Sequence, residues 1–308
     1  MRELIISSNE KEQRLDRFLK KYLANASSGN IQKMLRKRVF KINGKREKNG
    51  ALFLQEGDHL EIFLTEESLV PLLKAEKKHT ILAKPILDLI FENDDLLIFN
   101  KPTGQLTTPD TSNDTQSLTS QVQQAYQSLC SITFNPSPIQ RLDKNTSGLV
   151  VFAKNYNSLK NLNYEMRERK IQKFYQCIIE GVPSEKHGSI KGFLTKDTQS
   201  NKVTFSKQKS QNQKLEAKAI HTDYKVLKSK NGFSLLEIEL HSGRSHQIRV
   251  SLAYLGHPII GDLKYGAQKS TTKNLPNHQA LHAYKVVVNE ITIEHTSNSI
   301  ERVWNTLN

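Results

Sequence analysis

The chain has 308 residues, enough for one large domain with a smaller one attached, and 36% of them are hydrophobic. Its formal charge of +14 at pH 7 points to a polyanionic partner, with nucleic acid the first candidate and an anionic membrane surface the second. Cys130 and Cys177 fit neither C-x-x-C nor zinc-ligand spacing, which argues against a disulfide framework and for a reduced, cytoplasmic compartment. Because no apolar run approaches the roughly 18 residues of a membrane span, we expect a soluble protein.

The positive charge is concentrated near the N-terminus. Residues 11–50 contain 13 basic and three acidic side chains, so this segment carries +10 of the total +14. Apolar residues at helical spacing over 15–23 predict one amphipathic helix, and those at 31, 34 and 35 predict a second. Short strands are expected at 39–42 and 59–64, with a tight turn at Asn43-Gly44.

This pattern of two helices followed by strands resembles the S4 RNA-binding domain, in residues 14–19, 35–44 and 56–58. The resemblance implies that residues 1–67 form an S4-like RNA-binding domain. A merely solvated basic face is the alternative. The basic residues expected to contact RNA are Lys33, Arg36, Lys37, Arg38 and Lys41.

A second domain is expected over residues 86–308, after a linker at 68–85 that mixes charges with Pro71 and Pro85. A hairpin of 86–91 and 96–99 opens it, and a helix is expected around 159–166. Further strands are predicted at 149–152, 174–180, 203–206, 217–227 and 233–240. Without alternating strand and helix units, this pattern predicts an α+β fold with a mainly antiparallel sheet.

Asp143 is the strongest candidate for chemistry. Its carboxylate lies between Arg141 and Lys144 on a polar turn that leads into an apolar, strand-like run. Nearby cations favour the ionised carboxylate, which could then act as a nucleophile or base. The alternative is a surface turn with ordinary ion pairs.

A second polar cluster occupies residues 241–250, just before an apolar helical segment. It contains Arg244 and Arg249, which could clamp a phosphate or pair with a buried carboxylate. His241 and His246 raise the alternative of a zinc site. They lack a cysteine nearby and a third ligand at a usual spacing, so we predict no metal.

Residues 86–285 resemble the catalytic domain of the RluA family of pseudouridine synthases, particularly its RluC-like members. The resemblance rests on four segments in the family's order: residues 100–104, 141–149, 173–181 and 243–266. It implies a pseudouridine synthase fold and an isomerase that converts specific uridines of RNA without a cofactor. The implied substrate is 23S (large-subunit) ribosomal RNA; no obligate protein partner is implied, and we expect a monomer.

The same resemblance assigns roles to individual residues. Asp143 is implied to be the essential aspartate, Tyr175 the aromatic residue packed against the target base, and Arg249 the basic partner of Asp143. Arg141 is implied to help displace the target from the RNA stack. Lys101, in the first segment, is expected to contact RNA.

The chemistry of the reaction agrees with these residue types. Isomerisation breaks the N1–C1′ bond, turns the uracil and joins C5 to C1′ without redox change. It needs an ionised carboxylate and a dry pocket for a flipped-out nucleotide. Attack at C1′, addition at C6 and a glycal route through C2′ all stay open, and Tyr175 is also a candidate proton acceptor. Many members of the family have histidine where this chain has Gln140.

Other classes of function stay open at this point. One is a non-catalytic RNA-binding or ribosome-assembly protein that keeps the fold. Another is a different RNA-modifying enzyme, such as a methyltransferase, but no G-x-G-x-x-G motif follows a predicted strand. Membrane-surface binding is disfavoured because no basic amphipathic helix carries its own aromatic anchors.

Overall fold

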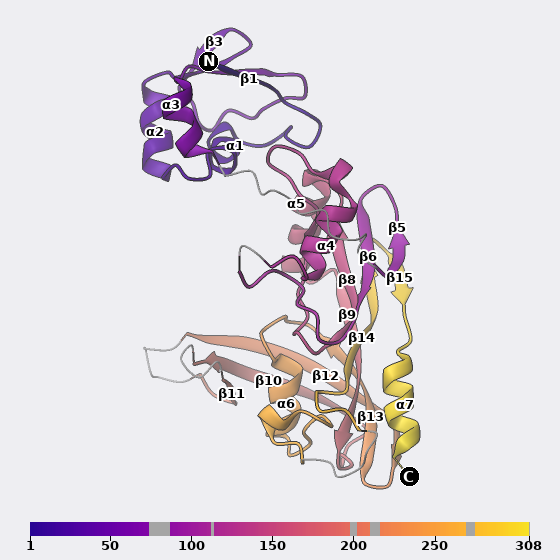
Figure 1. The fold of residues 1–308 in the computed structure, drawn as a ribbon. Coiled ribbons are helices and arrows are strands. Elements are labelled where there is room, and N and C mark those ends of the chain that lie inside the picture. The colour runs from indigo at the N-terminus through magenta and orange to yellow at the C-terminus, as the bar shows by residue number, and fades with distance from the viewer. Residues whose placement is uncertain (74–86, 112–113, 198–201, 210–215, 269–274, 308) are drawn as a thin grey trace. The chain divides into compact units, whose positions relative to one another are not determined.

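The computed structural model describes residues 1–73, 87–111, 114–197, 202–209, 216–268 and 275–307 (Figure 1). The chain divides into two compact units. The first comprises Met1–Ile86, Gln121–Ser137 and Ala153–Lys160, and the second comprises Leu87–Ser120, Pro138–Phe152 and Asn161–Asn308.

The N-terminal part of the first unit combines a small sheet with two main helices. The sheet has four strands in the order β1-β4-β2-β3, and neighbouring strands pair antiparallel. The elements are β1 (Arg2–Ile5), α1 (Leu15–Tyr22), α2 (Ser28–Arg36), β2 (Phe40–Ile42), β3 (Lys45–Glu47), β4 (His59–Ile62), α3 (Glu66–Leu69) and the 3₁₀ turn η1 (Val70–Leu72).

Both predicted helices are present, and each buries its apolar face in the core of this part. Helix α1 contributes Leu15, Phe18 and Leu19, all fully buried. Helix α2 begins where the Ser27 hydroxyl accepts a hydrogen bond from the Asn30 backbone N–H at 3.1 Å, a standard N-cap. The basic side chains of α2 are left on its exposed side.

The start of the predicted linker differs from expectation. Leu69 of α3 is fully buried in the same hydrophobic core, and Leu72 and Leu73 pack against that core. The Asn25 amide donates hydrogen bonds to the carbonyls of Pro71 and Leu73, at 3.2 and 2.7 Å. Residues 68–73 are therefore part of the folded first unit and not a linker, because their leucines pack into its hydrophobic core. The rest of the predicted linker, 74–85, and the expected hairpin start at residue 86 lie outside the described residues.

The larger sheet has 11 strands, with the main order β11-β10-β12-β13-β9-β14-β8-β6-β5 (Figure 1). β14 and β8 pair in parallel, whereas the neighbours from β11 to β14 pair antiparallel. The remaining elements are β5 (Leu89–Glu92), β6 (Leu96–Lys101), α4 (Leu118–Ala125), the 3₁₀ turn η2 (Gln127–Leu129), β7 (Ser137–Pro138), β8 (Ser147–Ala153), α5 (Tyr156–Arg167), β9 (Gln172–Glu180), β10 (His187–Lys196), β11 (Val203–Ser206), β12 (Ala217–Lys230), β13 (Phe233–Leu240), α6 (Gln247–Tyr254), the 3₁₀ turn η3 (Leu263–Tyr265), β14 (Leu281–Val288), β15 (Ile291–Glu294) and α7 (Asn298–Thr306).

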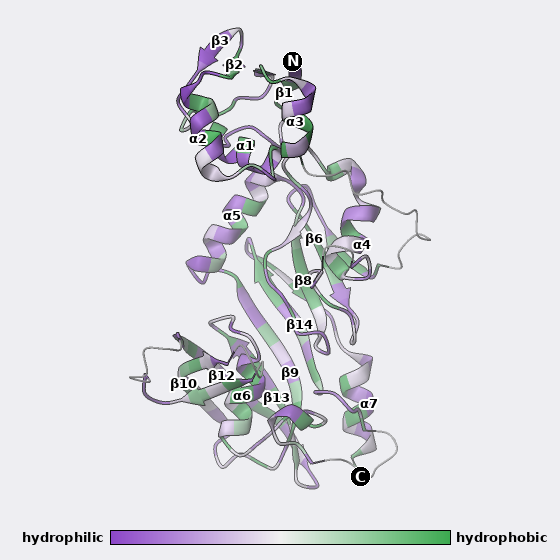
Figure 2. Cartoon of the chain, turned by 60° about the vertical axis from the view of Figure 1, so that its left-hand side comes forward, coloured by the Kyte–Doolittle hydropathy of each residue, from purple (hydrophilic) through white to green (hydrophobic). Residues whose placement is uncertain are grey.

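The mainly antiparallel α+β class is confirmed, and β13 has the bounds predicted from the sequence. Hydrophobic residues concentrate on the central strands β6, β8, β9 and β14 (Figure 2), whose buried side chains include Phe99, Phe152 and Ile178. Helix α6 lies against β11 and β12, and α7 against β9 (Figure 1). Among the helices of the described ranges, none is long and apolar enough to cross a membrane.

Gly148 allows β8 to approach β14 closely. Its φ is +116°, and a Cβ built there would lie 2.3 Å from the backbone oxygen of Ala283, which stands opposite it in the ladder. A larger residue would combine backbone strain with a clash against main chain. The position therefore requires glycine, five residues beyond the Asp143 turn that the strand holds.

The same pair of strands buries a neutral histidine. His282 of β14 is 2% exposed; its Nδ1 lies 2.8 Å from the Ser147 hydroxyl and its Nε2 lies 3.1 Å from the His295 carbonyl oxygen. Because a carbonyl only accepts, the proton is on Nε2 and Nδ1 accepts from Ser147. Burial lowers the pKa of His282 to about 4.

Acid should destabilise the protein through His282. The unfolded chain binds this proton near pH 6.5 and the folded protein only near pH 4. The contribution of His282 to the free energy of unfolding is therefore fully present above pH 6.5 and is lost as pH drops below it. The loss from this residue approaches about 3 kcal/mol at pH 4. Urea unfolding from pH 7 to pH 4 should show a shallower pH dependence for His282→Gln. The exposed control His187→Gln should follow the wild type, and identical slopes for all three proteins would contradict the assignment.

Candidate active site

Asp143 lies on the turn that connects β7 to β8, and buried side chains hold the peptides on both sides of it. The turn is closed by the Thr146 N–H, which donates to the Asp143 carbonyl at 3.0 Å. On the N-terminal side, the Thr107 hydroxyl accepts from the Leu142 N–H and donates to the Leu142 carbonyl, both at 3.0 Å. Thr107 is only 2% exposed, so water competes little for these bonds.

Lys101 holds the C-terminal side of the turn. Its side chain is completely buried, and Nζ donates to the carbonyls of Pro102, Gln105 and Lys144 at 2.9, 2.8 and 3.1 Å. Burial lowers the pKa of Lys101 to about 8, against the attraction of Asp143, so the ammonium is still the main form at neutral pH. This corrects the expectation that Lys101 contacts RNA. Its three donors are already used inside the protein, where they position the Asp143 turn.

The Asp143 carboxylate pairs with Arg249 of α6. Nη1 of Arg249 donates to Oδ2 of Asp143 at 3.1 Å. The same guanidinium makes a two-bond contact with Asp262, from Nε to Oδ2 at 2.6 Å and from Nη2 to Oδ1 at 2.8 Å. Arg249 and Asp262 side chains are 9% and 1% exposed, whereas that of Asp143 is 28% exposed. The structure thus brings the predicted pair together and adds a second, buried carboxylate.

Arg249 stays protonated although it is buried. Burial alone would lower its pKa, but the hydrogen bonds and charge of Asp262, together with those of Asp143, outweigh burial and raise the pKa of Arg249. Asp262 is a residue of the site that the sequence alone does not reveal. It lies within the segment 243–266 that carried the family resemblance, but no local pattern marks it as the partner of Arg249.

His246 and Tyr265 complete the surroundings of Asp143. His246 caps α6 with a positive φ of 55°, and its Nε2 lies 4.0 Å from Oδ2 of Asp143. Its Nδ1 lies 2.6 Å from the hydroxyl of Tyr265, whose ring lies 5.0 Å from the Arg249 guanidinium. Burial lowers the pKa of His246, and the nearby Arg249 and Lys264 act in the same direction against Asp143, so the ring is neutral at pH 7.

Tyr175 lies on the central strand β9, lines the same cavity as Asp143 and is 6% exposed. Burial, reinforced by the charge of Asp143, raises the pKa of Tyr175 above its ordinary value. The hydroxyl therefore stays protonated at neutral pH, and a neutral phenol has no phenolate oxygen with which to accept a proton, which argues against the suggested role of Tyr175 as a proton acceptor. Its position suits an aromatic wall instead.

Thr107, Asp143, Tyr175, His246 and Arg249 line a cavity of about 780 Å³. Of the described lining residues, Asp143 alone carries a carboxylate. Gln140 also lines the cavity, and its side-chain oxygen is buried without a hydrogen-bond partner in the described part of the chain. The cationic lining residues are Arg141, Lys144, Lys173, Arg244, Arg249 and Lys264. One carboxylate among many cations suits a phosphate-bearing substrate that undergoes chemistry at a single point.

Comparison with known proteins identifies the class of enzyme. A sequence profile described as RNA pseudouridylate synthase matches residues 95–254. An uncharacterised RNA pseudouridine synthase of Aquifex aeolicus is 31% identical over 264 residues, 84% of this chain and 79% of that protein. The chain belongs to the RNA pseudouridine synthases. A pseudouridine synthase is an isomerase, so the non-catalytic and methyltransferase alternatives fall away.

Two further comparisons support this membership. The ribosomal large subunit pseudouridine synthase C of Rickettsia bellii is 32% identical to this synthase over 90% of each chain. The human RNA pseudouridylate synthase domain containing 4 superposes with a TM-score of 0.59, at 21% identity, over 71% of this chain and 92% of its own. This second likeness shows a shared fold.

The basic residues that sequence analysis selected for RNA contact occupy two places in the synthase. Arg141 is exposed and lines the cavity, next to Asp143 in the chain. The residues Lys33, Arg36, Lys37 and Arg38 are exposed on α2 and directly after it, in the first unit. Lys41 is less available, because its ammonium lies 3.7 Å from Glu61 and over the Phe63 ring.

The Thr107 contact provides a test of how the synthase positions its aspartate. Thr107→Val keeps the shape but removes both hydrogen bonds to Leu142, so the Asp143 turn should shift. We expect the single-turnover rate of pseudouridine formation to fall about tenfold to hundredfold, with RNA affinity unchanged. Thr107→Ser retains the hydroxyl and should stay close to wild type. If the valine and serine variants react equally fast, the hydroxyl does not position Asp143.

Proposed function

We propose that this synthase isomerises uridines of large-subunit ribosomal RNA, with Asp143 as the catalytic carboxylate. The observation that carries the proposal is the Asp143–Arg249 pair in a cavity where, among the residues that the structure describes, the other charged lining residues are cationic. Relatives named for the ribosomal large subunit, in Rickettsia bellii and in Borreliella burgdorferi, are 32% and 29% identical to this chain and favour that RNA as the substrate.

The geometry defines what each residue would do. Arg249 donates to one oxygen of Asp143, which orients the carboxylate while 28% of the side chain stays accessible to a substrate. Attack at C1′, addition at C6 and proton removal at C2′ all begin from such an ionised, oriented oxygen. Tyr175, buried and protonated, would pack against the flipped uracil and exclude water from it.

Binding of the flipped nucleotide would use the cationic lining. Extruding a base from its stack costs a few kcal/mol, which phosphate contacts and stacking offset. Arg141 is exposed beside Asp143 and would occupy the space that the target base leaves. No step of the isomerisation changes oxidation state, so the proposed reaction needs no redox cofactor.

The first unit would supply general affinity for RNA. Its sequence resembles the S4 RNA-binding domain, and Lys33 of α2 and Lys37 at its C-cap are exposed cations. Such residues gain free energy by displacing counterions from phosphate, without reading sequence. The affinity of the protein would then depend strongly on salt.

Replacing Asp143 by asparagine tests the catalytic assignment. Asp143→Asn keeps the size of the side chain but removes its charge, so pseudouridine formation should fall about ten-thousandfold or more. Binding of the same RNA, measured by fluorescence anisotropy, should persist. Asp94→Asn, in the exposed turn between β5 and β6, is the matched control and should keep wild-type activity. An Asp143→Asn protein with full activity would refute the role of this residue.

The substrate is tested by mapping pseudouridines in RNA from cells with and without the protein. We expect one or more large-subunit ribosomal uridines to lose modification when the gene is deleted and to regain it with the wild-type protein. The Asp143→Asn protein should not restore them. Loss of sites only in transfer RNA would overturn the proposed substrate while leaving the enzyme class intact.

Charge neutralisation on α2 tests the binding role of the first unit. Lys33→Gln/Lys37→Gln removes two potential phosphate contacts, so RNA affinity should fall. The slope of log affinity against log salt should become shallower by about 1.5. The control Lys225→Gln/Lys228→Gln removes two exposed lysines of β12 from the second unit and should change neither quantity as much. Equal effects of the two double variants would mean that α2 is not a preferred RNA contact.

A further inference from the structure

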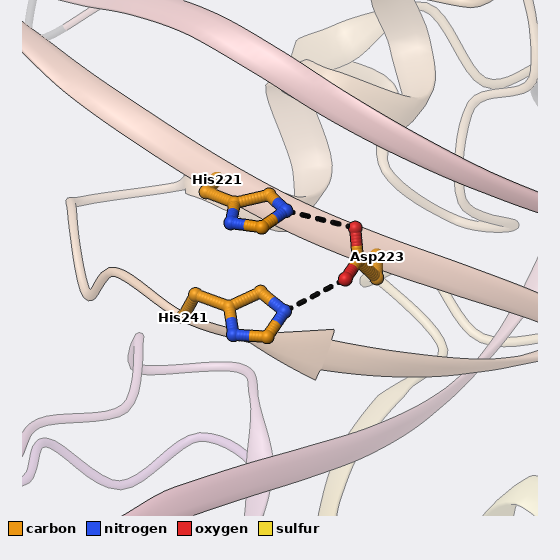
Figure 3. Close-up of side chains that lie close together, drawn as sticks. All are labelled: His221, Asp223 and His241. Atoms are coloured by element: carbon orange, nitrogen blue, oxygen red, sulfur yellow. Dashed lines mark hydrogen bonds and ion pairs between the residues drawn. The ribbon is translucent and has the colours of Figure 1, made fainter. Parts of the chain in front are cut away.

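Two histidines and an aspartate meet on the face of the β12–β13 pair, outside the cavity (Figure 3). His221 and Asp223 alternate along β12 and so share one face of the sheet. In the antiparallel register Asp223 stands opposite Glu239 and Thr222 opposite Leu240, which places His241 across from His221. The third ligand that the sequence around His241 lacked therefore comes from the neighbouring strand.

The donor atoms of this cluster converge. Nε2 of His221 lies 3.0 Å from Oδ1 of Asp223, and Nε2 of His241 lies 2.8 Å from Oδ2 of the same carboxylate. The imidazole rings stack with centroids 4.1 Å apart and an interplanar angle of 19°. Figure 3 shows both rings pointing their Nε2 atoms at Asp223. One potential ligand atom from each residue lies within 4.8 Å of the other two.

We propose that His221, Asp223 and His241 bind a divalent transition metal ion of the zinc class. Two imidazole nitrogens and a carboxylate oxygen form a donor set that Zn²⁺ and Co²⁺ accept readily. In a tetrahedral site with bonds of about 2.0–2.1 Å, the ligand atoms are about 3.3 Å apart. The nitrogen–oxygen distances of 2.8 and 3.0 Å, one to each oxygen of the Asp223 carboxylate, are shorter than this by a few tenths of an ångström.

The surroundings allow and orient such an ion. The three side chains are 27%, 38% and 26% exposed, so water can reach the ion and fill the remaining coordination position. Nδ1 of His241, the nitrogen that would not bind metal, lies 3.7 Å from Oε1 of Glu239. A carboxylate behind a ligating imidazole is the usual device for fixing its orientation. Ser189, whose hydroxyl lies 3.0 Å from Nε2 of His221, would rotate away.

The position of the cluster indicates a structural role for the ion. The His221 N–H donates to the Ser242 hydroxyl at 3.0 Å, and the Gln247 amide donates to the His221 carbonyl at 3.1 Å. Both contacts lie at the base of the loop that leads into α6 and Arg249. Because none of the three ligands lines the cavity, the ion would hold β12 to this loop and take no part in the isomerisation.

Metal titration of the full-length protein without a histidine tag tests this site. Competition with a chromophoric chelator should show one Zn²⁺ bound per chain, and Co²⁺ should give visible absorption typical of nitrogen and oxygen ligands. His221→Gln and His241→Gln should each weaken Zn²⁺ binding at least about tenfold. His187→Gln removes an exposed histidine outside the cluster and should bind like the wild type. Zn²⁺ should also raise the melting temperature of the wild type and of His187→Gln only.

Two results would overturn the proposal. One is the absence of stoichiometric Zn²⁺ uptake by the wild type, which would leave the cluster as a hydrogen-bonded trio. The other is equal uptake by the wild type and both cluster variants, which would place the ion elsewhere. Should a variant misfold by circular dichroism, imidazole nitrogen NMR of the wild type decides: Zn²⁺ must perturb two histidine rings, and their assignment must be His221 and His241.

Discussion

Arg249 carries a permanent charge into a part of the protein where only 9% of its side chain is exposed, and Asp262 makes this possible. Moving an ion out of water costs several kcal/mol, and a buried guanidinium without a partner would destabilise the fold. The two-bond contact with Asp262 uses Nε and Nη2 and fixes the plane of the guanidinium. Nη1 is then aimed at Asp143. A lysine has no such planar set of donors and could not orient both carboxylates at once.

The sharing of one cation between two carboxylates also sets the charge that a substrate meets. Asp262 already compensates Arg249, so the trio of Asp143, Arg249 and Asp262 has a net charge of −1 when ionised. Asp143 is oriented by Arg249, whose charge it shares with Asp262. Arg141, Lys144, Arg244 and Lys264 line the same cavity and can interact with phosphates. The carboxylate needed for chemistry and the cations needed for binding thus coexist in one cavity without cancelling each other.

The sequence predicts the sheet better than it predicts the support of the active site. Periodic apolar residues predicted β13 to its last residue, and the motif residues Asp143, Tyr175 and Arg249 do meet at one cavity. Thr107 was missed and Lys101 was misassigned. Each acts by hydrogen bonding to backbone groups of the Asp143 turn, which is far away in the sequence, and no motif spacing reveals such contacts. A buried lysine that donates to three carbonyls looks, in a basic sequence, like one more cation for RNA.

The cluster of His221, Asp223 and His241 also could not be predicted from the sequence alone. His221 and Asp223 follow strand alternation, but the identity of their partner depends on which strand lies next to β12 and in which register. A shift of one residue would turn His241 to the opposite face of the sheet. The loop from β13 to α6 therefore contributes to two places. Its first residue, His241, joins the cluster on β12, and the helix that follows it places Arg249 beside Asp143. Any change that alters the β12–β13 register would disturb both together, although the cluster and the cavity share no residue.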